Sequence, residues 1–325
     1  MEKFSITRFV PPVLQELQGD RLTAREIAMK VYERHPEACE AKRQRSRAVV
    51  QPLDSYEGLI QQIVAEIGAQ RQHLERRFGI KSTEERPRKY FYSTSSDDAD
   101  VQAVEEGKPV TASLRFDDAT AVSPVRRKPM EAELYPLLSQ FLFSELRISS
   151  KRIDEKRSRN SRGPEGNKWL FPDVVGIENL TADWSAEVID CAKAYSDPRS
   201  KLYSFEVKVL LNRSNVRQSY FQAVSNSSWA NFPYLVTSEI HGDTLAELRV
   251  LAGTHGVGVI KVNADNPSES EILIPARERT TVDWNSANRI ASENADFVEF
   301  LNHVKYFQQT GQLKSQDWDY ASDVG

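Results

Sequence analysis

The chain has 325 residues, of which 39% are hydrophobic and 28% charged, and its net charge is −4. This length suits two domains, and the composition is that of an ordinary soluble protein. No apolar run approaches the roughly 20 residues that cross a bilayer, and we expect no signal peptide at the start. Cys39 and Cys191 are too few for a disulfide framework and lack the spacing of a zinc site. We therefore expect a cytoplasmic protein with no membrane partner.

Residues 1–92 are expected to form a small helical domain that ends in a strand. Thr23 followed by Glu26 is a capping-box pattern, and a break in the helical spacing falls near Gly68. Apolar residues at helical spacing predict helices over 9–17, 24–32 and 59–78, and residues 89–92 have strand character. Short helices, a basic helix and a terminal strand together predict a winged-helix-like domain.

The charge of this first domain differs from that of the rest of the chain. Residues 1–92 carry 17 Lys and Arg against 13 Asp and Glu, whereas the remainder carries 26 against 34. A winged helix binds duplex DNA by placing one helix in the major groove while basic side chains contact phosphates. We expect these contacts from basic residues of the last helix and of the wing: Arg71, Arg76, Arg77, Lys81 and Lys89. The alternative is a winged helix that mediates protein contacts or dimerisation.

A second domain is expected over residues 131–325, after a linker. Residues 93–130 are polar and lack periodicity, as inter-domain linkers do. Beyond them strands and helices alternate, which predicts an α/β domain with a mixed sheet flanked by helices. Helices are expected over 131–146, 216–227, 244–252, 283–290 and 293–309, and strands over 169–177, 202–211, 234–240, 258–262 and 271–275. Residues 147–168 should form a basic loop, and 178–200 an inserted loop or helix.

Glu206 and Lys208 stand two residues apart in an apolar strand, so both side chains leave it on the same face. An acid and a base on such a strand cost stability unless they meet each other or a metal. Functional sites tolerate this cost. The ordinary alternative is a solvated strand face, because Glu-x-Lys occurs by chance in many proteins.

Asp173 repeats the anomaly in a run, 169–177, that otherwise has the character of a buried strand. If the two strands pair, Asp173 and Glu206 can hold Mg²⁺, which accepts one or two carboxylates and a phosphate oxygen. The metal would polarise a scissile phosphate and lower the pKa of an attacking water. Lys208 would orient that water or stabilise the negative charge that develops. Asp173 and Glu206 are 33 residues apart, so this prediction depends on pairing across an insertion.

The order of an acid on a first helix, Pro-Asp on one strand and Glu-Val-Lys on the next resembles the PD-(D/E)xK nuclease superfamily. The resemblance implies a restriction-endonuclease-like fold in which Asp173 and Glu206 bind the metal and Lys208 is catalytic. It also implies a further metal-binding acid on the helix over 131–146, either Glu131 or Glu133. For both, the alternative is an acid favoured at a helix N-terminus by the helix dipole.

The helix after Glu-Val-Lys also resembles these nucleases, in which a glutamine there faces the active site. Gln222 would take this catalytic position; it shares a helix face with Gln218 and Asn226. The alternative is a polar helix surface.

The whole arrangement is similar to HrgA-like bacterial proteins, which join a helix-turn-helix domain to such a nuclease domain and are associated with restriction or phage defence. These resemblances imply an endonuclease that uses Mg²⁺, or Mn²⁺, and acts on double-stranded DNA. A homodimer is expected, because two active sites cut two strands most simply. The alternatives are a DNA-binding regulator with an inactive nuclease-like domain, and a nuclease specific for RNA or for a nucleic-acid structure.

Overall fold

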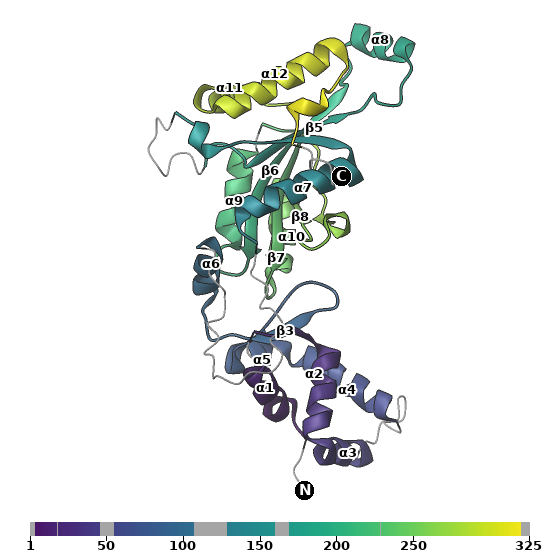
Figure 1. The fold of residues 1–325 in the computed structure, drawn as a ribbon, viewed down its shortest axis with the longest axis vertical. Coiled ribbons are helices and arrows are strands. Elements are labelled where there is room, and N and C mark those ends of the chain that lie inside the picture. Colours follow the sequence, from purple (N-terminus) through teal and green to yellow (C-terminus); the bar gives the residue numbers. More distant parts are fainter. Residues whose placement is uncertain are drawn as a thin grey trace. The chain divides into compact units, whose positions relative to one another are not determined.

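The computed structural model describes residues 4–17, 19–45, 55–106, 129–159, 169–227 and 229–319. The chain divides into two compact units (Figure 1). The first is Met1–Arg127 together with Ile240–Asp243, and the second is Lys128–Glu239 together with Thr244–Gly325. No helix in these described residues is long and apolar enough to cross a membrane.

The first unit packs helices against a small antiparallel sheet with strand order β1-β3-β2. Its helices are α1 (Ile6–Glu16), α2 (Ala24–Arg34), α3 (Pro36–Arg45), α4 (Tyr56–Ala69), α5 (Arg71–Phe78) and α6 (Asp97–Glu105). Its strands are β1 (Leu22–Thr23), β2 (Ile80–Ser82) and β3 (Lys89–Tyr92). The Thr23–Glu26 capping box starts α2 as expected.

The break predicted near Gly68 is present, because the 59–78 stretch forms two helices that meet at Gln70. Two other features of the first unit differ from the expectation. Helix α3 was not predicted, because few of its residues are apolar. Helix α6 lies within the predicted linker 93–130; its Asp100 is fully buried and pairs with Lys81 at 2.5 Å. Since this tertiary ion pair holds a polar helix in place, hydrophobic periodicity could not reveal it. Residues 107–128 of that linker lie outside the described residues.

The second unit is a mixed six-stranded sheet flanked by helices, as predicted at the level of fold class, with strand order β4-β5-β6-β7-β8-β9. The strands are β4 (Ile148–Arg152), β5 (Val174–Asn179), β6 (Ser200–Leu211), β7 (Phe232–Ile240), β8 (Gly258–Lys261) and β9 (Glu271–Ile274). The helices are α7 (Glu131–Leu146), α8 (Ala186–Tyr195), α9 (Val216–Asn226), α10 (Thr244–His255), α11 (Trp284–Glu293) and α12 (Ala295–Thr310). Strand β5 is antiparallel to both of its neighbours, β4 and β6, whereas β7 and β8 are parallel.

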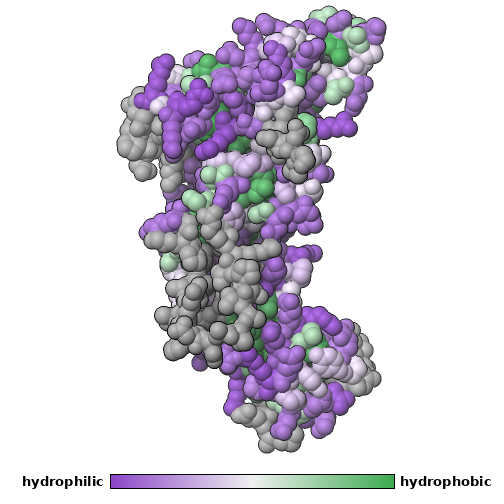
Figure 2. Space-filling model, in the orientation of Figure 1, coloured by the Kyte–Doolittle hydropathy of each residue, from purple (hydrophilic) through white to green (hydrophobic). Residues whose placement is uncertain are grey.

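The core beside β5 and β6 is aromatic. Trp229 is fully buried and meets Phe297 and Phe300 edge to face, with ring centroids 5.0 and 5.9 Å away. Both phenylalanines belong to α12, so this helix anchors the end of the sheet where the candidate site lies. On the face that Figure 2 shows, hydrophilic side chains predominate on the surface.

Two boundaries near the site were wrong in the expectation. Strand β5 begins at Val174 rather than at Trp169, because the turn at 169–170 and Pro172 precede it.

Strand β4 occupies part of the predicted basic loop 147–168; its sequence Ile-Ser-Ser-Lys-Arg is polar. The Ser150 hydroxyl is buried and hydrogen-bonds to that of Ser139 on α7 at 2.9 Å. A Cβ at Gly176 would lie 2.7 Å from the Ile148 side chain, so glycine permits the close packing of β4 on β5. The predicted insertion 178–200 contains α8.

Candidate active site

The strand register places Asp173 beside Glu206. Val174 pairs with Phe205 in the antiparallel β5–β6 ladder. One residue earlier, the Asp173 N–H donates to the Phe205 carbonyl at 3.1 Å. The Asp173 carboxylate accepts a hydrogen bond from the Val207 N–H at 2.7 Å. The two strands therefore meet across the insertion, and they meet at the position where both carboxylates stand.

Glu206 is fully buried and has a partner at each carboxylate oxygen. Lys208 Nζ donates to Oε1 at 2.8 Å, and Asn226 Nδ2 on α9 donates to Oε2 at 2.8 Å. Burial raises the pKa of Glu206, while Lys208 and Asn226 lower it in part. Asn226 thus fixes the orientation of this carboxylate.

Asp173 lies immediately before β5, is partly exposed, and has one carboxylate oxygen available. The Oδ2 atom is held by Val207, whereas the described residues offer Oδ1 no hydrogen bond. Loss of solvation raises the pKa of Asp173 well above its ordinary value, and the charge of Glu206 raises it further. An open carboxylate oxygen with a raised pKa is one that a cation would stabilise.

Lys208 is an ammonium group among carboxylates. Burial alone would lower its pKa, but the charges of Glu206 and Asp173 outweigh that effect and raise it. Lys208 therefore keeps its proton at neutral pH. It can stabilise negative charge, and it is unsuited to accepting a proton.

Helix α7 brings Glu131 to the site and leaves Glu133 out of it. Glu131 Oε2 lies 3.8 Å from Lys208 Nζ, and its Oε1 accepts a hydrogen bond from the Tyr135 hydroxyl at 2.8 Å. Glu133 instead accepts from the Met130 N–H at 2.7 Å, which caps its own helix. The two acids, equivalent in the sequence, therefore have different surroundings. We call Asp173, Glu206, Lys208 and Glu131 the carboxylate cluster.

Helix α9 presents buried polar side chains next to Glu206. Gln218 is exposed, and Gln222 is buried one turn before Asn226. The side chain of this helix that hydrogen-bonds to Glu206 is that of Asn226, which sequence reasoning noted only as a neighbour of the glutamines. Tyr135 was also missed, although its spacing of four residues from Glu131 placed both on one helix face.

The carboxylate cluster fits a hard divalent cation in its chemistry. It holds three carboxylates and one ammonium, so all the atoms that could coordinate a metal are oxygens. Burial raises the pKa of both Asp173 and Glu206. Within the described residues, no group of three or more His, Cys, Asp or Glu side chains is arranged to hold a metal by itself. Mg²⁺ needs fewer protein ligands than that, because it retains several waters and binds only one or two carboxylates. Asp173 and Glu206 fit that requirement.

The predicted DNA-contacting residues of the first unit divide into two groups. Arg71 pairs with Asp243, and Lys81 pairs with Asp97 and Asp100; both cations are largely buried. Lys89 is more exposed and lies 3.4 Å from Glu85, while Arg76 and Arg77 are exposed near the end of α5. Arg71 and Lys81 thus stabilise the unit, and the others remain accessible.

In comparisons of sequence and structure, the chain matches no family of known proteins, no curated protein and no solved structure. The function is therefore inferred from the geometry and the chemistry of the site.

Proposed function

We propose that this chain is a metal-dependent nuclease that hydrolyses phosphodiester bonds of DNA. The observation that carries the proposal is the meeting of Asp173, Glu206 and Lys208 where β5 begins beside β6. The order of helix acid, Pro-Asp and Glu-Val-Lys, carried by α7, the start of β5 and β6, supports the resemblance to PD-(D/E)xK nucleases. The setting of bacterial restriction or phage defence rests on that resemblance.

Each residue of the site has a role that follows from its surroundings. Asp173 and Glu206, with Glu131 nearby, would hold Mg²⁺, or Mn²⁺ in its place. When bound, such an ion supplies positive charge at the phosphate and lowers the pKa of a coordinated water. Asn226 keeps Glu206 oriented, and Tyr135 does so for Glu131. The Lys208 ammonium stabilises the negative charge that develops on the phosphoryl oxygens as water adds and the sugar oxygen leaves.

Cleavage of supercoiled and linear DNA with Mg²⁺ tests the proposal. We expect cleavage by the wild type that EDTA abolishes, and a loss of about 10²- to 10³-fold in Asp173→Asn and in Lys208→Met, the usual cost of one electrostatic group. Lys151→Met is the matched control, because Lys151 pairs with Glu299 on α12, outside the carboxylate cluster. Cleavage by Asp173→Asn at the wild-type rate, or in EDTA, would contradict the proposal.

One observation favours the second candidate, a DNA-binding regulator with an inactive nuclease-like domain. Lys208 occupies one oxygen of Glu206, so the site is stabilised in part without a metal. Such a regulator would retard DNA in a gel equally well with EDTA and with Mg²⁺, and it would never cleave. The same DNA and the same variants therefore separate the two functions.

A further inference from the structure

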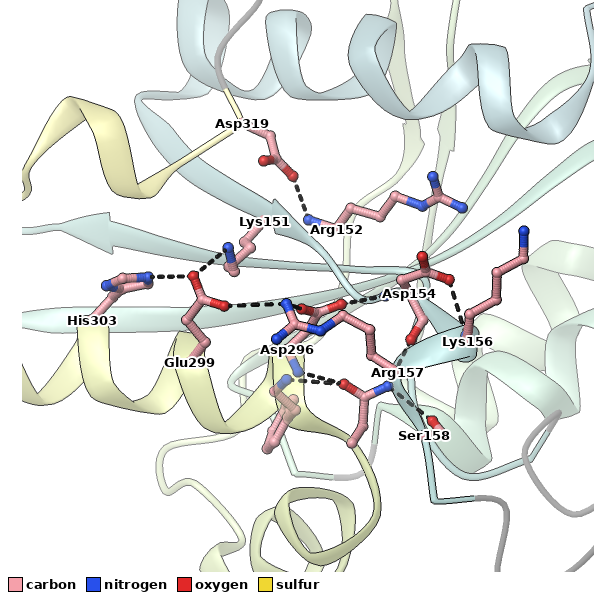
Figure 3. A network of polar contacts seen from close by, with 12 residues as sticks. Lys151, Arg152, Asp154, Lys156, Arg157, Ser158, Asp296, Glu299, His303 and Asp319 are labelled. Carbon is pink, nitrogen blue, oxygen red and sulfur yellow. Dashed lines mark hydrogen bonds and ion pairs between the residues drawn. The ribbon is translucent and has the colours of Figure 1, made fainter.

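Cations of the segment 151–157 differ in whether they have an acidic partner. Lys151 Nζ lies 3.2 Å from Glu299, and Arg157 pairs with Asp296 and, at 3.4 Å, with Glu299. Arg152 and Lys156 have no carboxylate partner for their side chains among the described residues. Figure 3 shows both of these side chains running away from the carboxylates of α12.

Arg152 is nevertheless held in place. Its N–H donates to Asp319 Oδ2 at 2.5 Å, and in the β4–β5 ladder it lies opposite Val174. Its guanidinium lies over the ring of Tyr135, 4.5 Å from the centroid. Stacking uses the flat face of a guanidinium and leaves its in-plane N–H groups free to bind an acceptor. Arg152 is thus an exposed arginine with an ordered position and available donors.

Two connections place Arg152 beside the carboxylate cluster. Through the backbone, the next residue, Ile153, donates its N–H to the Asp173 carbonyl at 2.9 Å. Through side chains, Arg152 stacks on Tyr135, whose hydroxyl donates to Glu131 at 2.8 Å. The guanidinium therefore stands at the edge of the site that would hold the scissile phosphate.

The negative charge of the site favours a cation at this edge. Three carboxylates against one ammonium repel a polyanionic strand, and an arginine beside them offsets that repulsion. A guanidinium donates two parallel hydrogen bonds to a phosphate, which fixes orientation as well as charge. Arg152 has the chemistry for a phosphodiester group next to the one being cut.

We propose that Arg152 binds a backbone phosphate of the substrate and positions the nucleic-acid strand over Tyr135, with Lys156 adding a second cationic contact. This inference rests on the proposed function, and it names an unassigned substrate-binding residue of that site. Its substrate class is a nucleic-acid strand bound through phosphates, so the contact is independent of base sequence.

The test is the salt dependence of binding by the full chain to a fluorescently labelled DNA duplex, with Ca²⁺ in place of Mg²⁺. Each phosphate contact contributes about 0.9 to the slope of log affinity against log salt concentration. We expect Arg152→Ala to reduce the magnitude of this slope by about one. Binding should weaken about 10- to 100-fold, the range for lost hydrogen bonds to a charged group. Arg152→Lys should retain the slope and recover only part of the affinity, because an ammonium lacks the planar fork.

Arg157→Ala is the matched control, since it removes an equal charge from the same segment but from a side chain already paired with Asp296 and Glu299. It should leave the slope unchanged. A wild-type slope in Arg152→Ala, an equal decrease in Arg157→Ala, or no salt-dependent binding by the wild type would overturn the inference. If the wild type binds DNA but never cleaves it with Mg²⁺, the proposed function fails while the slopes still decide the role of Arg152. Thermal unfolding of each variant separates lost binding from lost folding.

Discussion

Two groups of charged residues in the second unit differ in their balance. In the α12 network (Asp296, Glu299, Lys151 and Arg157), each carboxylate meets a cation, and Asp296 also accepts the Asp154 N–H at 2.9 Å (Figure 3). In the carboxylate cluster, three carboxylates share the single ammonium of Lys208. The charges of the α12 network are balanced within the protein, whereas the carboxylate cluster has an excess of negative charge.

This difference separates stability from function. A buried charge without compensation destabilises a fold, so it persists where a ligand completes it. Removing a charge from the α12 network should therefore lower stability and leave catalysis intact. Removing a carboxylate charge from the carboxylate cluster should strongly lower the cleavage rate and leave stability intact or raise it.

Beyond Asp173 and Lys208, the largest expected effect comes from Glu131→Gln, which removes a charge of the carboxylate cluster and retains the side-chain shape. We expect cleavage to fall about 100-fold, in the range for losing one electrostatic group at a reacting phosphate. Glu133→Gln makes the same chemical change two residues away, at a side chain that caps its helix. Single-turnover cleavage should separate the two variants. Equal losses in both would show that Glu131 has no special role.

Next in size is Asp296→Ala in the α12 network. It removes a largely buried carboxylate that accepts the Asp154 N–H and pairs with Arg157. We expect the free energy of unfolding to fall by about 2 kcal/mol, as for other buried hydrogen-bonded groups. The half-exposed Glu299 is the control; Glu299→Ala should cost less than about 1 kcal/mol.

Urea unfolding gives both values, and cleavage per folded molecule should stay at the wild-type level. A stability of Asp296→Ala equal to that of the wild type would mean that the α12 network does not stabilise the unit.

Local patterns predicted the parts of this structure that local interactions determine. The Thr23–Glu26 capping box and the helix over 131–146 depend on spacings of three and four residues, and both are present. Glu206 and Lys208 leave β6 together because the strand period is two, and they hydrogen-bond to each other. The pairing of Asp173 with this strand depends on tertiary structure, which spacing along the chain does not determine.

Features missed in the sequence depend on contacts between distant residues. Strand β4 is polar, and it forms because Ser150 bonds to Ser139 and Gly176 admits Ile148. Asn226 enters the site because α9 packs beside β6, and Arg152 because β4 pairs with β5. Charge alone could not separate Lys81, which is internally paired, from basic residues that remain accessible.

The smallest expected effect concerns the pH dependence of stability. The pKa values of Asp173 and Glu206 are raised in the folded state by burial. A carboxyl group whose pKa is raised in the folded state stabilises the fold when the pH is below its pKa in the unfolded chain, about 4. This stabilisation is lost as the pH rises through the pKa of the folded state. Asp173→Asn removes one such group, so it should raise stability at neutral pH in EDTA by on the order of 1 kcal/mol.

Thermal unfolding in EDTA from about pH 4, the ordinary carboxyl value, up to about pH 8 gives the measurement. The melting temperature of the wild type should fall more steeply with rising pH than that of Asp173→Asn. Asp183→Asn, at a highly exposed carboxylate, is the control for a charge change outside the cluster.

Mg²⁺ should raise the neutral-pH melting temperature of the wild type and leave that of Asp173→Asn nearly unchanged, because a ligand stabilises only the state that binds it. An Asp173→Asn variant that melts below the wild type in EDTA at neutral pH would show that Asp173 is compensated in the protein without metal. The charges of the carboxylate cluster would then be as well balanced within the protein as those of the α12 network.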